Sequence, residues 1–363
     1  MVIVDLLVSA GVRQRRVGLA DLEINEAELT QEPYRGADWG RAYWQEIRRY
    51  TRAWEPYFVY RIAEMHGQYI NVTSGVRTTY QPRISGRRRL VFLFGGSAAW
   101  GHGARDLGTL PSWLARVAEE HGDSWDVRNY AESGWVNWQG IVYLLEKLAD
   151  GERPEAVVFY SGVNETLTRR QWPDTPRPIW NADTYPSAMS EWMMQRDRPL
   201  ARAWAYYRNT SLVLHELFPQ PSYYRPGPAP SAHRLTDLVS AEYLAEKALV
   251  DALGRQYGFA SLFVWQPTVA AKPILSPQER RYAGWLPSSA DTKPPIDWWS
   301  MGGDLRDTYQ AIGRDVSRAG VIDLSSAFDG MSATAFIDWM HPAESGNERL
   351  ARVLYGKMAS QLR

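Results

Sequence analysis

The feature that most constrains this chain is an alternation of short apolar runs with amphipathic segments, which begins near residue 88. The first run, residues 89–94 (RLVFLF), stops at two glycines, and such a continuous run is typical of a strand buried on both faces of a parallel sheet. Further runs lie at residues 125–130, 156–160, 260–265 and 321–324. Helical patterns lie at about residues 109–121, 137–150, 236–257, 303–318 and 344–361. The alternation predicts a three-layer α/β/α fold around a doubly wound parallel sheet of roughly five strands.

The segments outside this alternation define the expected domain organisation. Residues 1–85 form an N-terminal accessory segment, with an amphipathic helix predicted at residues 38–53 and a β-hairpin at residues 68–80. The pattern leaves open whether this segment is a separate module or braces the sheet. The remaining chain, 86–363, carries two long insertions rich in aromatic residues, at about 165–235 and 270–302. Loops of this length are uncommon unless they are functional or disordered, and their aromatic content favours packed lids.

Charge and composition exclude several classes of protein. Lys+Arg and Asp+Glu both total 41, so the net charge is zero, which argues against a nucleic-acid binder. The chain has no cysteine, which excludes disulfides, thiolate nucleophiles and Cys-based metal sites. No stretch approaches the roughly 18 apolar residues of a membrane span. The first 16 residues predict a short amphipathic helix with its basic residues after the apolar run, which is the wrong order for a secretory signal, so we expect a cytoplasmic protein.

The chemistry of such a fold is expected at the carboxyl ends of the parallel strands. The first strand ends in Gly95-Gly96-Ser97, where a serine at a strand–helix turn can present its hydroxyl to a cleft. Taken alone this motif is weak, because a glycine-rich turn of this kind can also cradle a phosphate. The dinucleotide pattern G-x-G-x-x-G is absent in register, however, and the G-x-x-x-x-G-K-[ST] phosphate loop is absent altogether.

Three further strand ends carry candidate groups. Gly134 follows the second strand and could lend a backbone N–H to an anion, although an ordinary turn explains it equally well. Asn164 follows the third strand and could either donate its amide to an oxyanion or cap a helix. Asp338 precedes His341 by three residues at the last strand–helix junction, so its carboxylate could orient the imidazole as a general base. The other five histidines form no metal-type pair, and we predict no metal site; they are His66, His102, His121, His215 and His233.

In order and position these four motifs resemble those of the SGNH/GDSL hydrolase superfamily. The family's first motif, usually Gly-Asp-Ser, is matched by Gly95-Gly96-Ser97 except at Gly96. The glycine of its second motif maps onto Gly134, and its third motif, usually Gly-x-Asn-Asp, is matched by Gly162-Val163-Asn164-Glu165. Its fourth motif, Asp-x-x-His, is matched from Asp338 to His341. The resemblance covers about residues 88–363, with the two insertions interrupting it.

The resemblance implies a flavodoxin-like sheet and a serine hydrolase mechanism that needs no cofactor. Ser97 would be the nucleophile, His341 the general base and Asp338 the residue that orients it. The backbone N–H groups of Ser97 and Gly134 and the side chain of Asn164 would form the oxyanion hole. The absence of the family's Asp at position 96 removes no member of the triad, so we expect activity to be retained.

Three hypotheses for function follow. The first is an esterase that hydrolyses an O-acyl ester of a carbohydrate or small molecule, with a short acyl group. The second is an acyltransferase with the same triad, and the third is an inactive binding module that has lost catalysis, beginning at Gly96. The nearest mechanistic competitor, the α/β-hydrolase fold, uses G-x-S-x-G, whereas the fifth position here is Ala99. Trp100, Trp135 and Trp339 lie next to the motifs and are candidates to bind substrate, although packing explains each one equally well.

Overall fold

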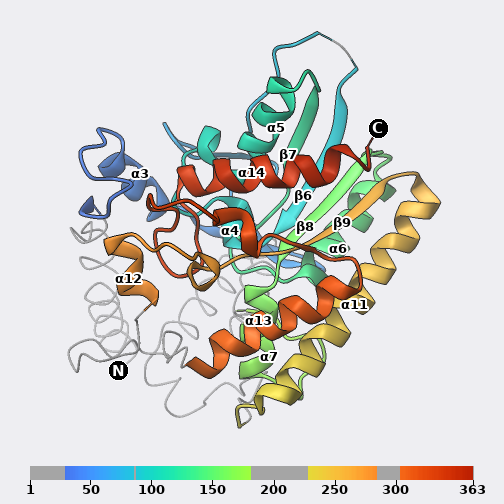
Figure 1. Ribbon diagram of the computed structural model, residues 1–363. Helices are drawn as coiled ribbons and strands as arrows, with labels where there is room; N and C mark the ends of the chain where they lie inside the picture. Colours follow the sequence, from blue (N-terminus) through green and yellow to red (C-terminus); the bar gives the residue numbers. More distant parts are fainter. Residues whose placement is uncertain (1–28, 86, 181–227, 284–302, 363) are drawn as a thin grey trace, which may run out of the picture.

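The computed structural model describes residues 29–85, 87–180, 228–283 and 303–362 (Figure 1). The helix predicted over the first 16 residues lies outside the described residues, as do the central parts of both insertions (181–227 and 284–302). None of the helices in the described ranges combines the length and apolar character needed to cross a membrane.

The centre of the molecule is a sheet whose strands follow the order β10-β9-β8-β6-β7-β5-β4-β3. The five neighbouring strands β7, β6, β8, β9 and β10 are parallel. Their order across the sheet is that of flavodoxin-like sheets. The predicted fold class and the five parallel strands are therefore confirmed. These strands are β6 (Arg89–Gly95), β7 (Trp125–Asn129), β8 (Ala156–Ser161), β9 (Ala260–Trp265) and β10 (Ile322–Asp323).

Helices cover both faces of this sheet. Successive residues of a strand point to opposite faces, so the apolar runs of β6 and β8 place apolar side chains on both. Val91 and Leu93 of β6 pack into one apolar cluster with α5 (Leu110–Glu120) and α14 (Glu344–Ala359). Phe92 and Phe94 pack into the other, with three helices that Figure 1 shows on the opposite face. These are α6 (Asn137–Ala149), α11 (Ala232–Tyr257) and α13 (Gly303–Arg318).

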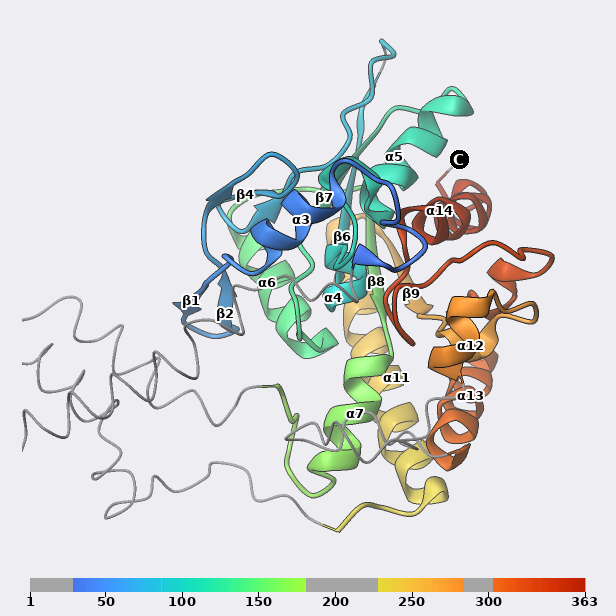
Figure 2. The same cartoon turned by 90° about the vertical axis from the view of Figure 1, so that its left-hand side faces the viewer.

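The N-terminal segment extends the sheet at its β7 edge (Figure 2). The predicted hairpin forms as β4 (Asn71–Thr73) and β5 (Val76–Arg77), and β5 pairs antiparallel with β7 through Arg77 and Asn129. The short β3 (Met65–His66) completes this edge. The segment thus braces the sheet.

The helix predicted at residues 38–53 is too long and needs correction. Helix α3 covers only Gly40–Ile47, and residues Arg52–Glu55 form β1, which pairs antiparallel with β2 (Val59–Ile62) in a separate two-stranded sheet. The last residues of the predicted helix, Arg52 and Ala53, belong to β1 because they pair with Ile62 and Arg61 of β2. Two further helices, α7 (Val163–Gln171) and α12 (Pro277–Ala283), lie at the described margins of the two predicted insertions.

Candidate active site

The turn after β6 places Ser97 at the start of the short helix α4 (Ser97–Trp100). Gly95 has a φ of +153°, and a Cβ added to it would lie 2.2 Å from the carbonyl oxygen of Tyr160 on β8. Only glycine fits there, since neither the backbone conformation nor the space admits a side chain. The tight turn brings the Ser97 hydroxyl to 2.7 Å from Nε2 of His341, which is 244 residues away in sequence.

Asp338 and His341 lie in one loop closed by backbone hydrogen bonds between residues 335–337 and 341–343. Oδ2 of Asp338 lies 2.6 Å from Nδ1 of His341, and Oδ1 accepts the backbone N–H groups of Met340 and His341 at 2.8 Å each. Burial acts to raise the pKa of Asp338, but the charge of His341 and these hydrogen bonds hold it below its ordinary value. An ionised Asp338 accepts the Nδ1 proton, which leaves Nε2 free to accept the proton of Ser97.

Polar groups behind the loop fix its position. The side chain of Gln266 donates to the carbonyl of Met340 at 3.0 Å. Glu279, which is fully buried, accepts the backbone N–H groups of Ala335 and Phe336 and pairs with the equally buried Lys272 at 2.5 Å. Sequence reasoning missed Glu279 and Lys272, because no pattern in the sequence indicates that α12 contacts a loop more than fifty residues away.

The expected oxyanion groups converge on the same turn. Gly134 has a φ of +85°, and a Cβ there would lie 2.7 Å from the hydroxyl of Tyr60. Asn164 lies in the first turn of α7 and donates its side-chain amide to the carbonyl of Trp135 at 2.8 Å. The backbone N–H groups of Ser97 and Gly134 donate to no other described residue, so both are available to a developing oxyanion.

Capping of helix α7 is performed by Glu165 rather than by Asn164. The Glu165 carboxylate accepts the N–H groups of Gly162 at 2.7 Å and Asn137 at 2.8 Å. Burial raises the pKa of this carboxyl to about 7. The helix-cap interpretation of Asn164 is therefore unnecessary, and its amide is left for the site.

The glycine at position 96 makes room for Asn164. A Cβ added to Gly96 would lie 2.4 Å from Nδ2 of Asn164 and 3.3 Å from the carbonyl oxygen of Trp135, the two atoms of the hydrogen bond that holds the amide. The backbone of Gly96 is extended, with φ −86° and ψ −159°, which any residue can adopt. A side chain at position 96 would therefore have to displace the Asn164 amide, whereas glycine leaves the amide in place.

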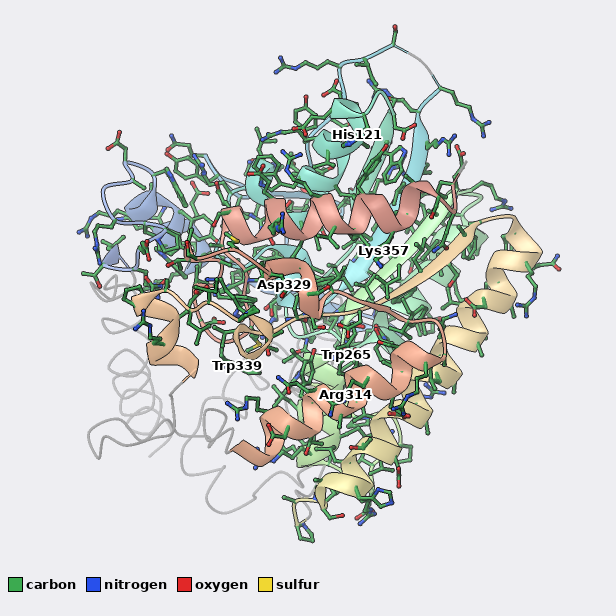
Figure 3. All side chains as sticks on the ribbon, in the orientation of Figure 1. His121, Trp265, Arg314, Asp329, Trp339 and Lys357 are labelled. Carbon is green, nitrogen blue, oxygen red and sulfur yellow. The ribbon has the colours of Figure 1, made fainter. Side chains whose placement is uncertain are left out.

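Two of the three tryptophans expected to bind substrate are buried, and that prediction is wrong for them. Trp100 is 1% exposed, and the guanidinium of Arg77 lies 4.1 Å from its ring centroid. Trp135 is also 1% exposed and donates its indole N–H to the carbonyl of Tyr60. Both rings pack in the core. Trp339 is half-buried in the loop between Asp338 and His341 (Figure 3).

A second histidine lies against the triad, and sequence reasoning missed it. The ring centroid of His102 is 4.7 Å from that of His341, with an angle of 50° between the planes. Its only sequence signal is its position five residues after Ser97, between Gly101 and Gly103. Within the described ranges, no group of three or more His, Asp or Glu side chains is placed to hold a metal ion.

Comparison with known proteins gives matches only among solved structures. No protein-family model matches the chain, and no curated protein matches it. One matching structure is an acetyl xylan esterase, 14% identical, over 76% of this chain and 100% of the other, with a TM-score of 0.36. Another is Est24, a carbohydrate acetylesterase from Sinorhizobium meliloti, 16% identical over 75% and 99% of the two chains, with a TM-score of 0.33. A third is a member of the lipolytic protein G-D-S-L family from Veillonella parvula, 10% identical over 76% and 100%, with a TM-score of 0.37. At such low identities and TM-scores, the function has to be inferred from this chain's own residues.

Proposed function

We propose that this protein is a serine esterase of the SGNH type, with Ser97, His341 and Asp338 as its triad. One observation carries the proposal: a continuous hydrogen-bonded chain runs from the Ser97 hydroxyl through both ring nitrogens of His341 to the Asp338 carboxylate, at 2.7 and 2.6 Å. Distances of this size place the base within reach of the nucleophile's proton and orient the base at the same time.

The geometry supports a two-step acyl transfer. Ser97 attacks the ester carbonyl while His341 takes its proton, and Asp338 stabilises the imidazolium that forms. The N–H groups of Ser97 and Gly134 and the amide of Asn164 stabilise the tetrahedral oxyanion. His341 then returns the proton to the leaving alcohol, and a water activated in the same way releases the acyl group from Ser97.

The proposed substrate is a short-chain O-acyl ester of a carbohydrate or small molecule. The half-buried ring of Trp339, in the loop that carries both Asp338 and His341, is the candidate for an aromatic wall beside the ester. Such a ring suits a sugar or another compact alcohol, because it offers an apolar face.

Hydrolysis of p-nitrophenyl acetate, butyrate and octanoate by the wild type and by Ser97→Ala tests the proposal. We expect turnover that falls with chain length, and a loss of about 10⁴-fold or more in Ser97→Ala, because the nucleophile is removed. A fluorophosphonate probe should label the wild type and not the variant. The control is Ser326→Ala, an exposed serine beyond β10, which should keep both turnover and labelling.

Three outcomes separate the hypotheses. Labelling of Ser97 without turnover of any simple ester would favour an acyltransferase with a particular acceptor. Absence of both labelling and turnover in the wild type would contradict the esterase and favour a binding module. Turnover that survives in Ser97→Ala would place the nucleophile elsewhere.

A further inference from the structure

His102 is held between two rings at the back of the triad. Its ring centroid lies 4.7 Å from that of His341 on one side and 5.7 Å from that of Trp44 on the other. Trp44 belongs to α3 of the N-terminal segment, outside the part of the chain that carries the four motifs. The backbone N–H of His102 donates to the carbonyl of Ser97 at 2.9 Å, so its loop is tied directly to the nucleophile.

The same loop is clamped from the N-terminal segment by Arg77 of β5. The guanidinium donates to the carbonyls of Trp100 and Gly101 at 2.9 Å each and to that of Ala104 at 2.7 Å. Its Nε pairs with Asp106 at 3.0 Å, and the Arg77 side chain is fully buried. One planar cation with rigidly arranged donors thus fixes two carbonyls before His102 and one after it.

Two tyrosines of the N-terminal segment hold the next residue. The hydroxyl of Tyr43 accepts the N–H of Gly103 at 2.6 Å, and the hydroxyl of Tyr34 donates to the carbonyl of Gly103 at 2.7 Å. Gly103 has a φ of +90°, and a Cβ there would lie 2.3 Å from the side chain of Ile337, next to Asp338. The backbone around His102 therefore has little freedom, and the ring is held in one place.

The ring of His102 is neutral, whereas the ring of His341 must become charged in the proposed mechanism. Desolvation, together with the charges of His341 and Arg77 and against the opposing charge of Asp338, lowers the pKa of His102 to about 3. A neutral aromatic ring packed against a cation attracts it through the negative charge on its face. The His341 imidazolium formed during catalysis would meet such a ring.

We propose that His102 is a positioning residue for the triad, and that residues 34–77 complete the active site by holding it. Its ring packs against His341, keeps Nε2 aimed at Ser97, and favours the imidazolium as it forms. This inference rests on the proposed esterase function for its effect on rate, whereas its effect on the His341 ring does not depend on that function.

Three substitutions at one position test the kinetic part: His102→Ala, His102→Phe and His102→Gln. With p-nitrophenyl acetate we expect His102→Ala to lower kcat about 3- to 30-fold, the range that corresponds to such a ring–cation contact, with KM changed less than about twofold. His102→Phe should restore most of the lost kcat, because it keeps an aromatic face. His102→Gln should not, because it keeps polarity without the face.

The control is another histidine stacked on a ring. His121 lies 4.5 Å from Tyr355, centroid to centroid, at the end of α5 and away from Trp339 of the triad loop (Figure 3). His121→Ala should leave kcat unchanged. A rise in KM with unchanged kcat in His102→Ala would overturn the proposal in favour of a substrate contact. Activity kept by His102→Gln and lost by His102→Phe would overturn it in favour of a hydrogen bond.

Proton NMR of the His341 ring tests positioning independently of turnover. The Nδ1 proton shared with Asp338 should give a downfield signal in the wild type and in His102→Phe, and this signal should broaden or vanish in His102→Ala. An unchanged signal in His102→Ala refutes the positioning role. If the wild type hydrolyses no ester, the proposed function fails, and this measurement still decides whether His102 holds the ring.

Discussion

Replacing Arg77 by methionine should be among the most damaging single changes to this fold. Methionine has a similar volume, so the change removes the charge and the donors and opens little space. The change leaves the carboxylate of Asp106, whose side chain is 8% exposed, without its cationic partner. It also removes the Arg77 donors from three carbonyls: Trp100 keeps the side-chain amide of Asn129 and Gly101 keeps the N–H of Ala104, whereas the carbonyl of Ala104 loses its donor. Removing one partner of a buried ion pair typically costs about 3–5 kcal/mol. We expect Arg77→Met to lower the free energy of unfolding by that amount.

The remaining contacts of Asp106 limit the loss. The side chain of Asn71 still donates to Asp106 at 2.9 Å, and burial already raises the pKa of this carboxyl, against the opposing effect of Arg77. Without Arg77 the carboxyl can take up a proton, and this limits the loss in the free energy of unfolding. The double variant Arg77→Met/Asp106→Asn, which no longer buries an unpaired charge, should therefore be more stable than Arg77→Met alone.

Urea unfolding followed by tryptophan fluorescence measures the effect, since the chain has 17 tryptophans and Trp100 lies under the Arg77 guanidinium. Arg87→Met is the matched control: its side chain is 83% exposed, 3.3 Å from Glu155, and its loss should cost less than about 1 kcal/mol. A loss below about 1 kcal/mol for Arg77→Met, or a double variant no more stable than the single one, would refute the account of a buried clamp.

Three further predictions concern the site, and a fourth concerns the pH dependence of stability. Asp338→Asn should lower kcat by about 10⁴-fold in ester hydrolysis with the fold retained by circular dichroism, because the amide favours the wrong tautomer of His341. Asn164→Ala should lower kcat by about 10²–10³-fold with little change in KM, as expected for one oxyanion donor; a loss confined to KM would contradict this role. Gly96→Ala should lower kcat through displacement of the Asn164 amide, and in the double variant Gly96→Ala/Asn164→Ala the two losses should not add; additive losses would show that they are independent. Burial raises the pKa of Glu132 to about 8, so the folded protein keeps a proton that the unfolded chain releases above about 4.5. Stability should therefore fall as pH rises through this window, by at most about 5 kcal/mol, and Glu132→Gln should flatten the dependence in urea titrations at pH 5 and 8.

Those parts of the fold that depend on local pattern could be predicted from the sequence. The runs that became β6 and β8 are apolar throughout because both of their faces are covered, and such runs have few alternatives. Their order along the chain, with right-handed crossovers, already places Ser97 and Asn164 at the same edge of the sheet. Asp338 and His341 were found because their pairing spans only three residues.

The parts that could not be predicted depend on contacts between distant residues. The pairing of β5 with β7 rests on a single register position, Arg77 opposite Asn129, and no hydrophobic pattern marks it. The tryptophans beside the motifs were misassigned for the same reason. A ring next to a functional residue in sequence can point into the core, and the burial of Trp100 and Trp135 is set by residues of the N-terminal segment: Arg77 over one ring, Tyr60 on the indole of the other.

The N-terminal segment also explains why a departure from the family pattern at Gly96 need not impair the site. Placement of the proposed oxyanion donors and the proposed base does not depend on a side chain beside Ser97. Asn164 is held through the carbonyl of Trp135, whose indole is in turn held by Tyr60 of β2. The turn with Gly134 is held from the same strand, since the hydroxyl of Tyr60 donates to the carbonyl of Ser133 at 2.9 Å. A segment that lies outside the resemblance thus supports the proposed oxyanion donors through Tyr60, and the side with His102 and His341 through Arg77, Tyr34 and Tyr43.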